Sequence, residues 1–258
     1  MTVAALANDA TSGLSSIQYS IDGGALQAGS SAIISTDGTH TVSFRAVDTA
    51  GNTTTSPTQT IKVDTIGPAI NITLPTVDGS DGWYKTVPVT VTALASDATS
   101  GLSSIQYSVD GGALQAGSSA QISTDGTHTV SFRAVDNAGN TTASSVQTVK
   151  IDTIGPAITL TTMGTMGGGG WYITTAQVLG SATDATSGLA GIEYSIDGGG
   201  WQSAPIQVGD GTHNVQIRAT DVASNTTTNT VVVKVWAFLQ LTLNRIYTAT
   251  NYYVTNIL

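Results

Sequence analysis

Aspartate recurs at equivalent places along this chain, close to glycine, serine and asparagine. Asp48, Asp136 and Asp221 each precede a short turn that contains Ala and Asn, while Asp64 and Asp152 lie in two copies of a D-T-I-G-P linker. A third set opens a repeated D-A-T-S-G loop: Asp9, Asp97 and Asp184. Because Ca²⁺ prefers carboxylate and carbonyl oxygens, aspartates at such junctions predict calcium binding that stiffens the chain. The residues assigned to it are Asp48, Asp64, Asp136 and Asp152.

The same aspartates also fit a purely structural role. Aspartate before Gly, Ser or Ala commonly caps a turn by accepting hydrogen bonds from backbone N–H groups. The sequence has no D-x-D-x-D-G series, and Trp236 replaces the linker aspartate at the end of the third repeat, which would leave that junction without metal. Calcium binding and turn capping are therefore alternatives, and no other cofactor is expected.

The three histidines, His40, His128 and His213, occupy the same place in each repeat, directly after D-G-T. A zinc site needs several ligands that converge on one point, and no cysteine or second histidine lies near any of them in the sequence. The pattern favours a structural role at the start of a strand.

Tryptophan offers a second kind of chemistry, because its ring can stack on a sugar. Trp83 and Trp171 recur in equivalent W-Y pairs, which favours packing between modules. Trp201 replaces Leu26 and Leu114 just after a hairpin turn, where partial exposure is expected. A carbohydrate or other cell-surface ligand is therefore one candidate partner, and structural packing is the alternative.

Composition argues against several other functions. The net charge of −9 leaves nothing to neutralise phosphates, so nucleic acid is not an expected partner. The most apolar run, VVVKVWAFLQL, contains Lys234 and is too short for membrane insertion. Ser, His and Asp occur at turn positions in every repeat rather than as one convergent set, so an enzyme is not expected. The start MTVAALANDA has no signal-peptide pattern, so an exported form would carry its targeting segment elsewhere.

Internal repetition is the feature that positions all these residues. DATSGLSSIQYSIDGGALQAGSS begins at Asp9, a near-copy begins 88 residues later at Asp97, and a looser copy begins a further 87 residues on at Asp184. From Asp9 to Thr54 the first two copies differ at three positions only: Ile21/Val109, Ile33/Gln121 and Thr49/Asn137. Such closeness indicates duplication rather than three specialised sites.

Each repeat is typical of a series of short strands. TVPVTVTALAS alternates from Val87 to Ala95, SIQYSVDGG places Ile105, Tyr107 and Val109 on one face, and HTVSFRAVD alternates in the same way. Asp110-Gly111 is a favoured hairpin dipeptide. About seven strands in 87 residues predict an all-β fold of tandem immunoglobulin-like β-sandwiches, whereas a propeller blade needs only about 40–50 residues.

The motifs Y-S-x-D-G-G, D-G-T-H-x-V, R-A-x-D-x-A-G-N and K-V-D-T-I-G-P follow one another in order, and their combination resembles the bacterial Ig-like repeats of cell-surface and secreted proteins. The resemblance covers nearly all of residues 1–236. It implies a stalk, spacer, adhesin or fibre, extracellular or on the surface of a bacterial cell and without catalysis. The predicted divisions are module 1 at 1–65, module 2 at 66–153, module 3 at 154–236 and a C-terminal segment at 237–258.

The two ends of the chain are complementary. Aligned on Asp9 and Asp97, Met1 falls opposite Val89, so module 1 lacks counterparts of AINITL and DGWYKT. The C-terminal segment supplies a divergent version of that missing piece, in which three alternating leucines match Ile70, Ile72 and Leu74. It lacks the D-T-I-G-P linker and the Gly-rich loop, and it gains tyrosines, as expected of a segment selected to bind.

We therefore expect a filament or fibre subunit in which the C-terminal segment acts as a donor strand to module 1 of the next copy. The alternatives are a stalk or ligand-binding part of a surface adhesin, cut from a longer repeat protein, and a segment that folds back onto module 3. The predicted donor residues are Phe238, Leu239, Leu241, Leu243, Tyr247, Tyr252, Tyr253 and Val254. The predicted acceptor residues are Met1, Val3, Ala5 and Ala7.

Overall fold

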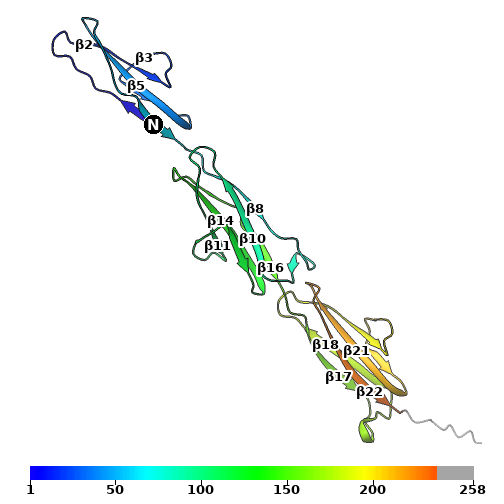
Figure 1. The fold of residues 1–258 in the computed structure, drawn as a ribbon. Helices are drawn as coiled ribbons and strands as arrows, with labels where there is room; N and C mark the ends of the chain where they lie inside the picture. Colours follow the sequence, from blue (N-terminus) through cyan, green and yellow to red (C-terminus); the bar gives the residue numbers. More distant parts are fainter. Residues whose placement is uncertain (237–258) are drawn as a thin grey trace, which may run out of the picture. The chain divides into compact units, whose positions relative to one another are not determined.

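The computed structural model describes residues 1–236, and these form the all-β chain that the sequence predicts (Figure 1). The chain divides into two compact units, Met1–Thr153 and Ile154–Leu258. The first unit holds modules 1 and 2, and the second holds module 3. Within residues 1–236 the helical structure is confined to a three-residue 3-10 turn, η1 (Gly168–Gly170). None of the described helical structure has the length and apolar character that a membrane span needs.

Module 1 is built from two small sheets. Its strands are β1 (Thr2–Ala4), β2 (Leu14–Ile21), β3 (Gln27–Ala28), β4 (Ser31–Ile33), β5 (Gly38–Asp48), β6 (Thr53–Thr55) and β7 (Gln59–Val63). One sheet is the pair β1-β4, and the other runs β3-β2-β5, with β6 and β7 both hydrogen-bonded to β5. All of these pairings are antiparallel.

Module 2 repeats this plan and adds a strand to each sheet. Its strands are β8 (Ala69–Thr73), β9 (Trp83–Tyr84), β10 (Val89–Ser96), β11 (Leu102–Val109), β12 (Gln115–Ala116), β13 (Ser119–Ile122), β14 (Gly126–Asp136), β15 (Thr141–Ala143) and β16 (Gln147–Ile151). The first sheet runs β13-β10-β8, and the second runs β12-β11-β14-β16-β9 with β15 paired to β14. The added strands are β8, antiparallel to β10, and β9, parallel to β16.

Module 3 has the same two-sheet plan. Its strands are β17 (Ala157–Met163), β18 (Ala176–Thr183), β19 (Leu189–Ile196), β20 (Ile206–Val208), β21 (Gly211–Asp221) and β22 (Thr226–Val235). The sheets run β17-β18-β20 and β19-β21-β22. An isolated parallel bridge between Tyr172 and Val235 takes the place of the β9-β16 pairing.

Turn chemistry and side-chain alternation explain this layout. Asp110 and Gly111, after β11, both adopt positive φ values, 51° and 67°, as a tight hairpin turn requires. Val89, Val91 and Ala93 of β10 are buried, as the alternation predicts. Val87 does not extend this face, because β10 begins after Pro88 and Val87 is exposed.

The two near-identical modules differ in how well their cores are covered. In module 2 the buried cluster includes Tyr84, Val149 and Ile151, and β8 packs Ile70 and Ile72 against it. In module 1 the buried cluster is smaller: Ala32, Ile34, Val42 and Phe44. This contrast arises from β8 and β9, since the remaining strands have counterparts in both modules.

Candidate functional site: a carboxylate cluster and an open sheet edge

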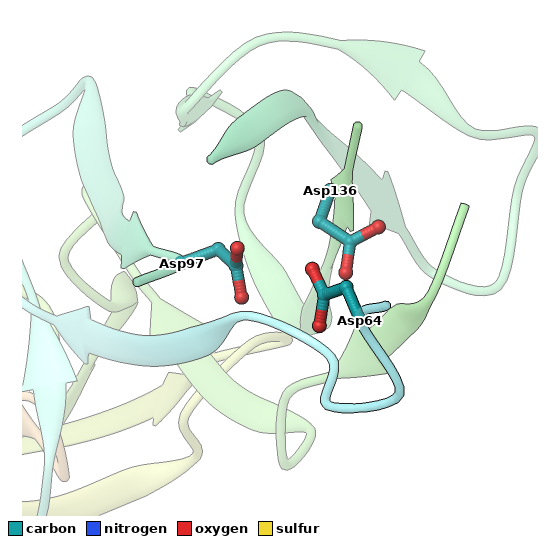
Figure 2. A group of neighbouring side chains, drawn as sticks. All are labelled: Asp64, Asp97 and Asp136. Carbon is teal, nitrogen blue, oxygen red and sulfur yellow. The ribbon is translucent and has the colours of Figure 1, made fainter. Parts of the chain in front are cut away.

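Three aspartates from separate parts of the first unit meet at one point, as Figure 2 shows. Asp64 follows β7, Asp97 follows β10 and Asp136 ends β14. Each offers a carboxylate oxygen, and these three oxygens lie within 4.8 Å of one another. Residues more than 30 positions apart in sequence are therefore brought together by the strand ends at the start of module 2.

Local hydrogen bonds hold the three carboxylates in place. Asp97 Oδ1 accepts hydrogen bonds from the backbone N–H groups of Ser100 (2.9 Å) and Gly101 (2.8 Å), and Asp64 Oδ2 accepts one from the same N–H of Ser100 (3.1 Å). The Asn140 side chain donates to Asp136 Oδ2 (2.9 Å) and to the backbone carbonyl of Asp64 (3.1 Å). One loop and one amide thus tie the end of module 1 to module 2.

Asp136 is the buried member of the group, with 2% of its surface exposed. Burial raises the pKa of its carboxyl, but hydrogen bonds from the side chain and backbone N–H of Asn140, together with backbone N–H groups of Gly139 and Ala138, outweigh burial. The pKa of Asp136 is therefore lowered from its usual 3.8, and the carboxylate is charged at neutral pH.

This arrangement has the chemistry of a site for a hard cation. In the described part of the chain, no Lys, Arg or His forms an ion pair with Asp64, Asp97 or Asp136. Converging carboxylates repel one another unless a cation lies between them, and Ca²⁺ takes oxygen ligands of this kind. The three side chains would supply part of such a shell, and carbonyl oxygens and water would supply the rest.

Within the first unit, the structure brings together two of the four aspartates assigned from sequence. Asp64 and Asp136 join the cluster, and Asp97 completes it although it was not among the assigned ligands. Asp48 lies apart from any such group of three: its carboxylate accepts hydrogen bonds from Asn52, and no described residue takes the place of Asp64 beside it. Asp152 is fully buried after β16, where its backbone N–H donates to the Tyr84 carbonyl (2.9 Å).

In module 3 the loop and turn aspartates keep their local roles. Asp184 Oδ1 accepts hydrogen bonds from the N–H groups of Thr186 and Gly188, as Asp97 does in module 2. Asp221 is buried and accepts from both the backbone and the side chain of Asn225. Turn capping, the alternative to calcium binding, is therefore real, and in module 2 it coexists with the cluster.

Each histidine contacts the aspartate of a neighbouring hairpin turn. His40 Nδ1 lies 2.8 Å from Asp22 Oδ2, and its Nε2 lies 3.0 Å from the Thr36 carbonyl oxygen. The same contact to aspartate joins His128 to Asp110 (2.9 Å), and His213 to Asp197 in module 3. The ring is thus a brace between a turn and the start of a long strand in every module.

The tryptophans are engaged within their own modules. Trp83 is buried, and Lys150 Nζ lies 5.7 Å from its ring centroid. In module 3, Trp201 carries the Arg218 guanidinium 4.4 Å from its ring centroid, and Arg218 is held by Glu193 at 2.6 Å. One face of the Trp201 ring is therefore covered by arginine, which limits sugar stacking there.

The second feature is a free sheet edge in module 1. Ala5-Leu6-Ala7 and Ala93-Leu94-Ala95 are identical tripeptides at equivalent positions. In module 2 this tripeptide is strand, paired with residues 70–72 of β8. In module 1, β1 ends at Ala4, and Leu6 is fully exposed. The same residues thus form a strand where a partner strand is present and lie outside any strand where the described residues supply none.

Strand β7 has a free edge of its own. In module 2 its counterpart β16 pairs with β14 on one side and β9 on the other, with Lys150 opposite Trp83 and Ile151 opposite Tyr84. Val149 and Ile151 are fully buried there. Their counterparts Ile61 and Val63 are only partly buried. The core of module 1 is therefore open along β7 as well as along β1.

The predicted acceptor residues surround this opening. Val3, Ala5 and Ala7 are partly buried and lie on the face that points into the core, while the Met1 side chain is exposed and its backbone pairs with Ile34. The predicted donor residues lie outside the described part of the chain. They are Phe238, Leu239, Leu241, Leu243, Tyr247, Tyr252, Tyr253 and Val254. Sequence reasoning missed the free edge of β7, although the missing W-Y pair indicated it.

Comparison with known proteins places these modules in a family. Residues 4–65 and residues 68–153 each match a family model described as a bacterial Ig-like domain. No curated protein matches the sequence.

Several solved structures resemble the chain at low identity. Fibronectin(III)-like modules of CbhA from Clostridium thermocellum are 18% identical over 64% of this chain and 95% of theirs, with a TM-score of 0.32. A 1.5-MDa bacterial ice-binding adhesin is 20% identical over 87% of this chain and 88% of its own, with a TM-score of 0.39. Protocadherin gammaB7 is 16% identical over 95% and 72%, with a TM-score of 0.41. Because all three TM-scores are below 0.5, no conclusion about this chain is drawn from these structures.

The two matched ranges together span more than half of the chain, and the third module repeats their motifs and their two-sheet plan. The resemblance to bacterial Ig-like repeats is therefore confirmed. The chain belongs to the bacterial Ig-like domains, as a tandem array of them.

Proposed function

We propose that this chain is a non-catalytic, extracellular structural protein whose copies join head to tail, the segment 237–258 of one copy completing module 1 of the next. The observation that carries the proposal is the identical Ala-Leu-Ala tripeptide, which pairs with β8 in module 2 and has no counterpart of that partner strand among the described residues of module 1. A free edge beside an open core is a site for strand addition.

The energetics favour a partner at this edge. Each core-facing apolar side chain that a donor strand brings is worth about 1.5–3 kcal/mol when fully buried. Three or four such side chains therefore supply roughly 5–12 kcal/mol, against a typical domain stability of about 5–15 kcal/mol. Module 1 gains a large fraction of its stability from the added strand.

Removing residues 237–258 tests this function. We expect the full-length protein to form oligomers whose size grows with concentration, because a head-to-tail contact that does not close into a ring continues indefinitely. The shortened chain should stay monomeric under the same conditions. Light scattering after size-exclusion chromatography and negative-stain images measure both. A full-length protein that stays monomeric at high concentration contradicts the proposal.

A stalk or spacer within a bacterial surface adhesin is the second candidate. It is favoured by the family match and by the near-identity of modules 1 and 2, which suits a part that provides length rather than recognition. Antibodies should label intact cells if the protein is either a filament subunit or an adhesin stalk, because both are extracellular, and should not label them if it is intracellular. If the chain without residues 237–258 still forms oligomers but no longer attaches to the cell surface, the stalk is favoured.

We also propose that calcium binds the Asp64, Asp97 and Asp136 cluster and holds the start of module 2 to the end of module 1. Three carboxylate oxygens of the cluster lie within 4.8 Å of one another and have no described cationic partner, and this supports the proposal. Calcium should raise the thermal midpoint of the full chain, and a chelator should lower it. Asp64→Asn should weaken that response, whereas Asp48→Asn should leave it unchanged. A thermal midpoint that ignores both calcium and chelator overturns the proposal.

A further inference from the structure

We infer that the opening in module 1 is a socket for two strands, in which residues 238–242 of a second copy pair antiparallel to residues 4–8 while Tyr252 and Tyr253 pair parallel to β7. This inference rests on the proposed head-to-tail function and specifies its register. The occupant is residues 237–258 of a second copy of this chain.

The first half of the register comes from module 2. There, Ala93 of β10 lies opposite Ile72 of β8, and Leu94 lies opposite Asn71. Transferred by the 88-residue repeat, Ala5 should lie opposite Leu241 and Leu6 opposite Gln240. Because alternate residues of a strand face opposite sides, this register points Leu239, Leu241 and Leu243 into the core. A slip of one residue would turn all three leucines to solvent.

The second half comes from β9. Its two residues pair in parallel with β16, Trp83 opposite Lys150 and Tyr84 opposite Ile151. The Tyr84 side chain is buried in the core cluster beside Val149 and Ile151, and its hydroxyl donates to the Pro75 carbonyl (2.7 Å). In module 1 the matching positions are Lys62 and Val63, whose β7 edge no described strand covers. Tyr252 and Tyr253 are therefore placed opposite them.

The spacing of the segment fits both strands at once. In module 2, 13 residues separate Ile70 from Trp83, and 13 residues also separate Leu239 from Tyr252. A segment with this spacing can follow the path of residues 70–84 from one sheet to the other without an insertion or deletion. The 22 residues beyond Trp236 are long enough for both strands and the connection between them.

Lys62 provides an independent sign that an aromatic residue belongs beside it. Its counterparts Lys150 and Lys234 each lie over a tryptophan ring, with Nζ 5.7 Å and 5.9 Å from the centroids of Trp83 and Trp171. Across residues 1–236, no aromatic ring lies over Lys62. Tyr252 falls at the ring position of this pair and restores the cation–π contact.

Cysteine pairs test the register directly, since the chain contains no cysteine of its own. Leu6→Cys in one full-length preparation is mixed with Gln240→Cys in another, so that a disulfide can form only between copies. Adjacent-strand positions lie within the Cα separation that a disulfide requires, about 4.4–6.8 Å. We expect a linked dimer on a non-reducing gel. The matched control, Leu6→Cys mixed with Leu241→Cys, should give little, because residue 241 faces the core.

The outcomes separate the register from the function on which it rests. Oligomers that form but link through position 241 rather than 240 overturn the register and leave head-to-tail assembly intact. Oligomers can also form without either link. If Leu6→Cys then links to a cysteine placed in a segment before residue 237, the strand at this edge is not residues 237–258. Absence of any association at high concentration overturns both the inference and the proposed function.

Lys62→Ala tests the second strand. We expect it to weaken association of the full-length chain about tenfold while leaving the melting of the isolated subunit unchanged. Lys150→Ala, whose ring partner lies in its own chain, should lower the melting temperature of module 2 and leave association unchanged. Equal association for wild type and Lys62→Ala contradicts the placement of Tyr252.

Discussion

At the scale of single residues, Asn140 does more than its counterpart Asn52. Both amides donate to the aspartate that ends a long strand, but Asn140 also donates to the Asp64 carbonyl at the start of the linker. The same side chain therefore caps a turn in module 1 and joins two modules in module 2. The difference depends on what lies beside the turn, since the turn sequences are alike.

Asn140→Ala should therefore be the more damaging of two equivalent substitutions. It removes hydrogen bonds to both the buried Asp136 and the linker, whereas Asn52→Ala removes one to a partly exposed Asp48. We expect Asn140→Ala to lower the thermal midpoint of module 2 by roughly 4–8 °C, the shift that a loss of about 1 kcal/mol gives in a domain of this size. Equal effects from the two variants would contradict this role of the linker contact.

The histidine braces predict a pH dependence. The Asp22 carboxylate, then the Thr36 carbonyl, raises the pKa of His40 above its usual 6.5 despite opposing desolvation, and Asp197 with the Asp210 carbonyl does the same for His213. The stability that these histidines contribute is fully present below pH 6.5, and it is lost as the pH rises through their pKa in the folded protein. The pKa values of Asp22 and Asp197 are lowered. The stability that these aspartates contribute is therefore present above pH 3.8, and it is lost as the pH falls through their pKa in the folded protein.

We therefore expect the thermal midpoint to be highest between pH 3.8 and 6.5 and to fall towards pH 8. Replacing His40 and His213 with Gln should flatten the fall above pH 6.5, because the titrating groups are gone. Thermal melts at several pH values provide the measurement. If the thermal midpoint of the double variant falls just as steeply above pH 6.5, groups other than His40 and His213 cause the fall.

At the scale of elements, the free edge can be tested with proline. Leu94 lies in β10 opposite Asn71, so Leu94→Pro should remove a ladder hydrogen bond and cost about 1–3 kcal/mol. Leu6→Pro at the equivalent, unpaired position should leave the isolated subunit nearly as stable as before. In the assembled protein, Leu6→Pro should block oligomers, because residue 6 then lacks the N–H that a donor strand needs. Equal melting losses from both prolines would show that residues 4–8 are already paired.

Most strands were predictable, because alternation and Asp-Gly turns are local signals. The extent of β1 was not, since Ala5-Leu6-Ala7 has the same residues as part of β10 and only the partner strand differs. Asp97 was missed as a cluster member for a related reason. Its Oδ1 caps its own loop by accepting from the N–H groups of Ser100 and Gly101, and this local role is sufficient to account for an aspartate there. Its nearness to Asp64 depends on the tertiary fold and is not visible in the sequence.

At the scale of the whole molecule, the modules should differ in stability. Module 1 has a smaller buried core than module 2 and, among residues 1–236, two edges without a partner strand. Calorimetry of the monomeric protein should therefore resolve a first transition, from module 1, below the others. If a strand from another copy binds the folded module as proposed, that transition should rise with protein concentration. A single transition independent of concentration would contradict both expectations.

The near-identity of modules 1 and 2 also sets a problem for folding. Residues 4–8 and 92–96 share Ala-Leu-Ala, and residues 92–96 pair with β8. If residues 4–8 accept a strand in the same way, β8 can pair with the wrong module of its own chain while that chain folds. Such a molecule would keep its strand content but lose the assembly socket. We expect rapid refolding to leave a monomeric fraction that does not polymerise, and slow refolding to reduce it. If copies join head to tail as proposed, the edge that accepts a neighbour's strand thus also gives the chain a route to block its own assembly.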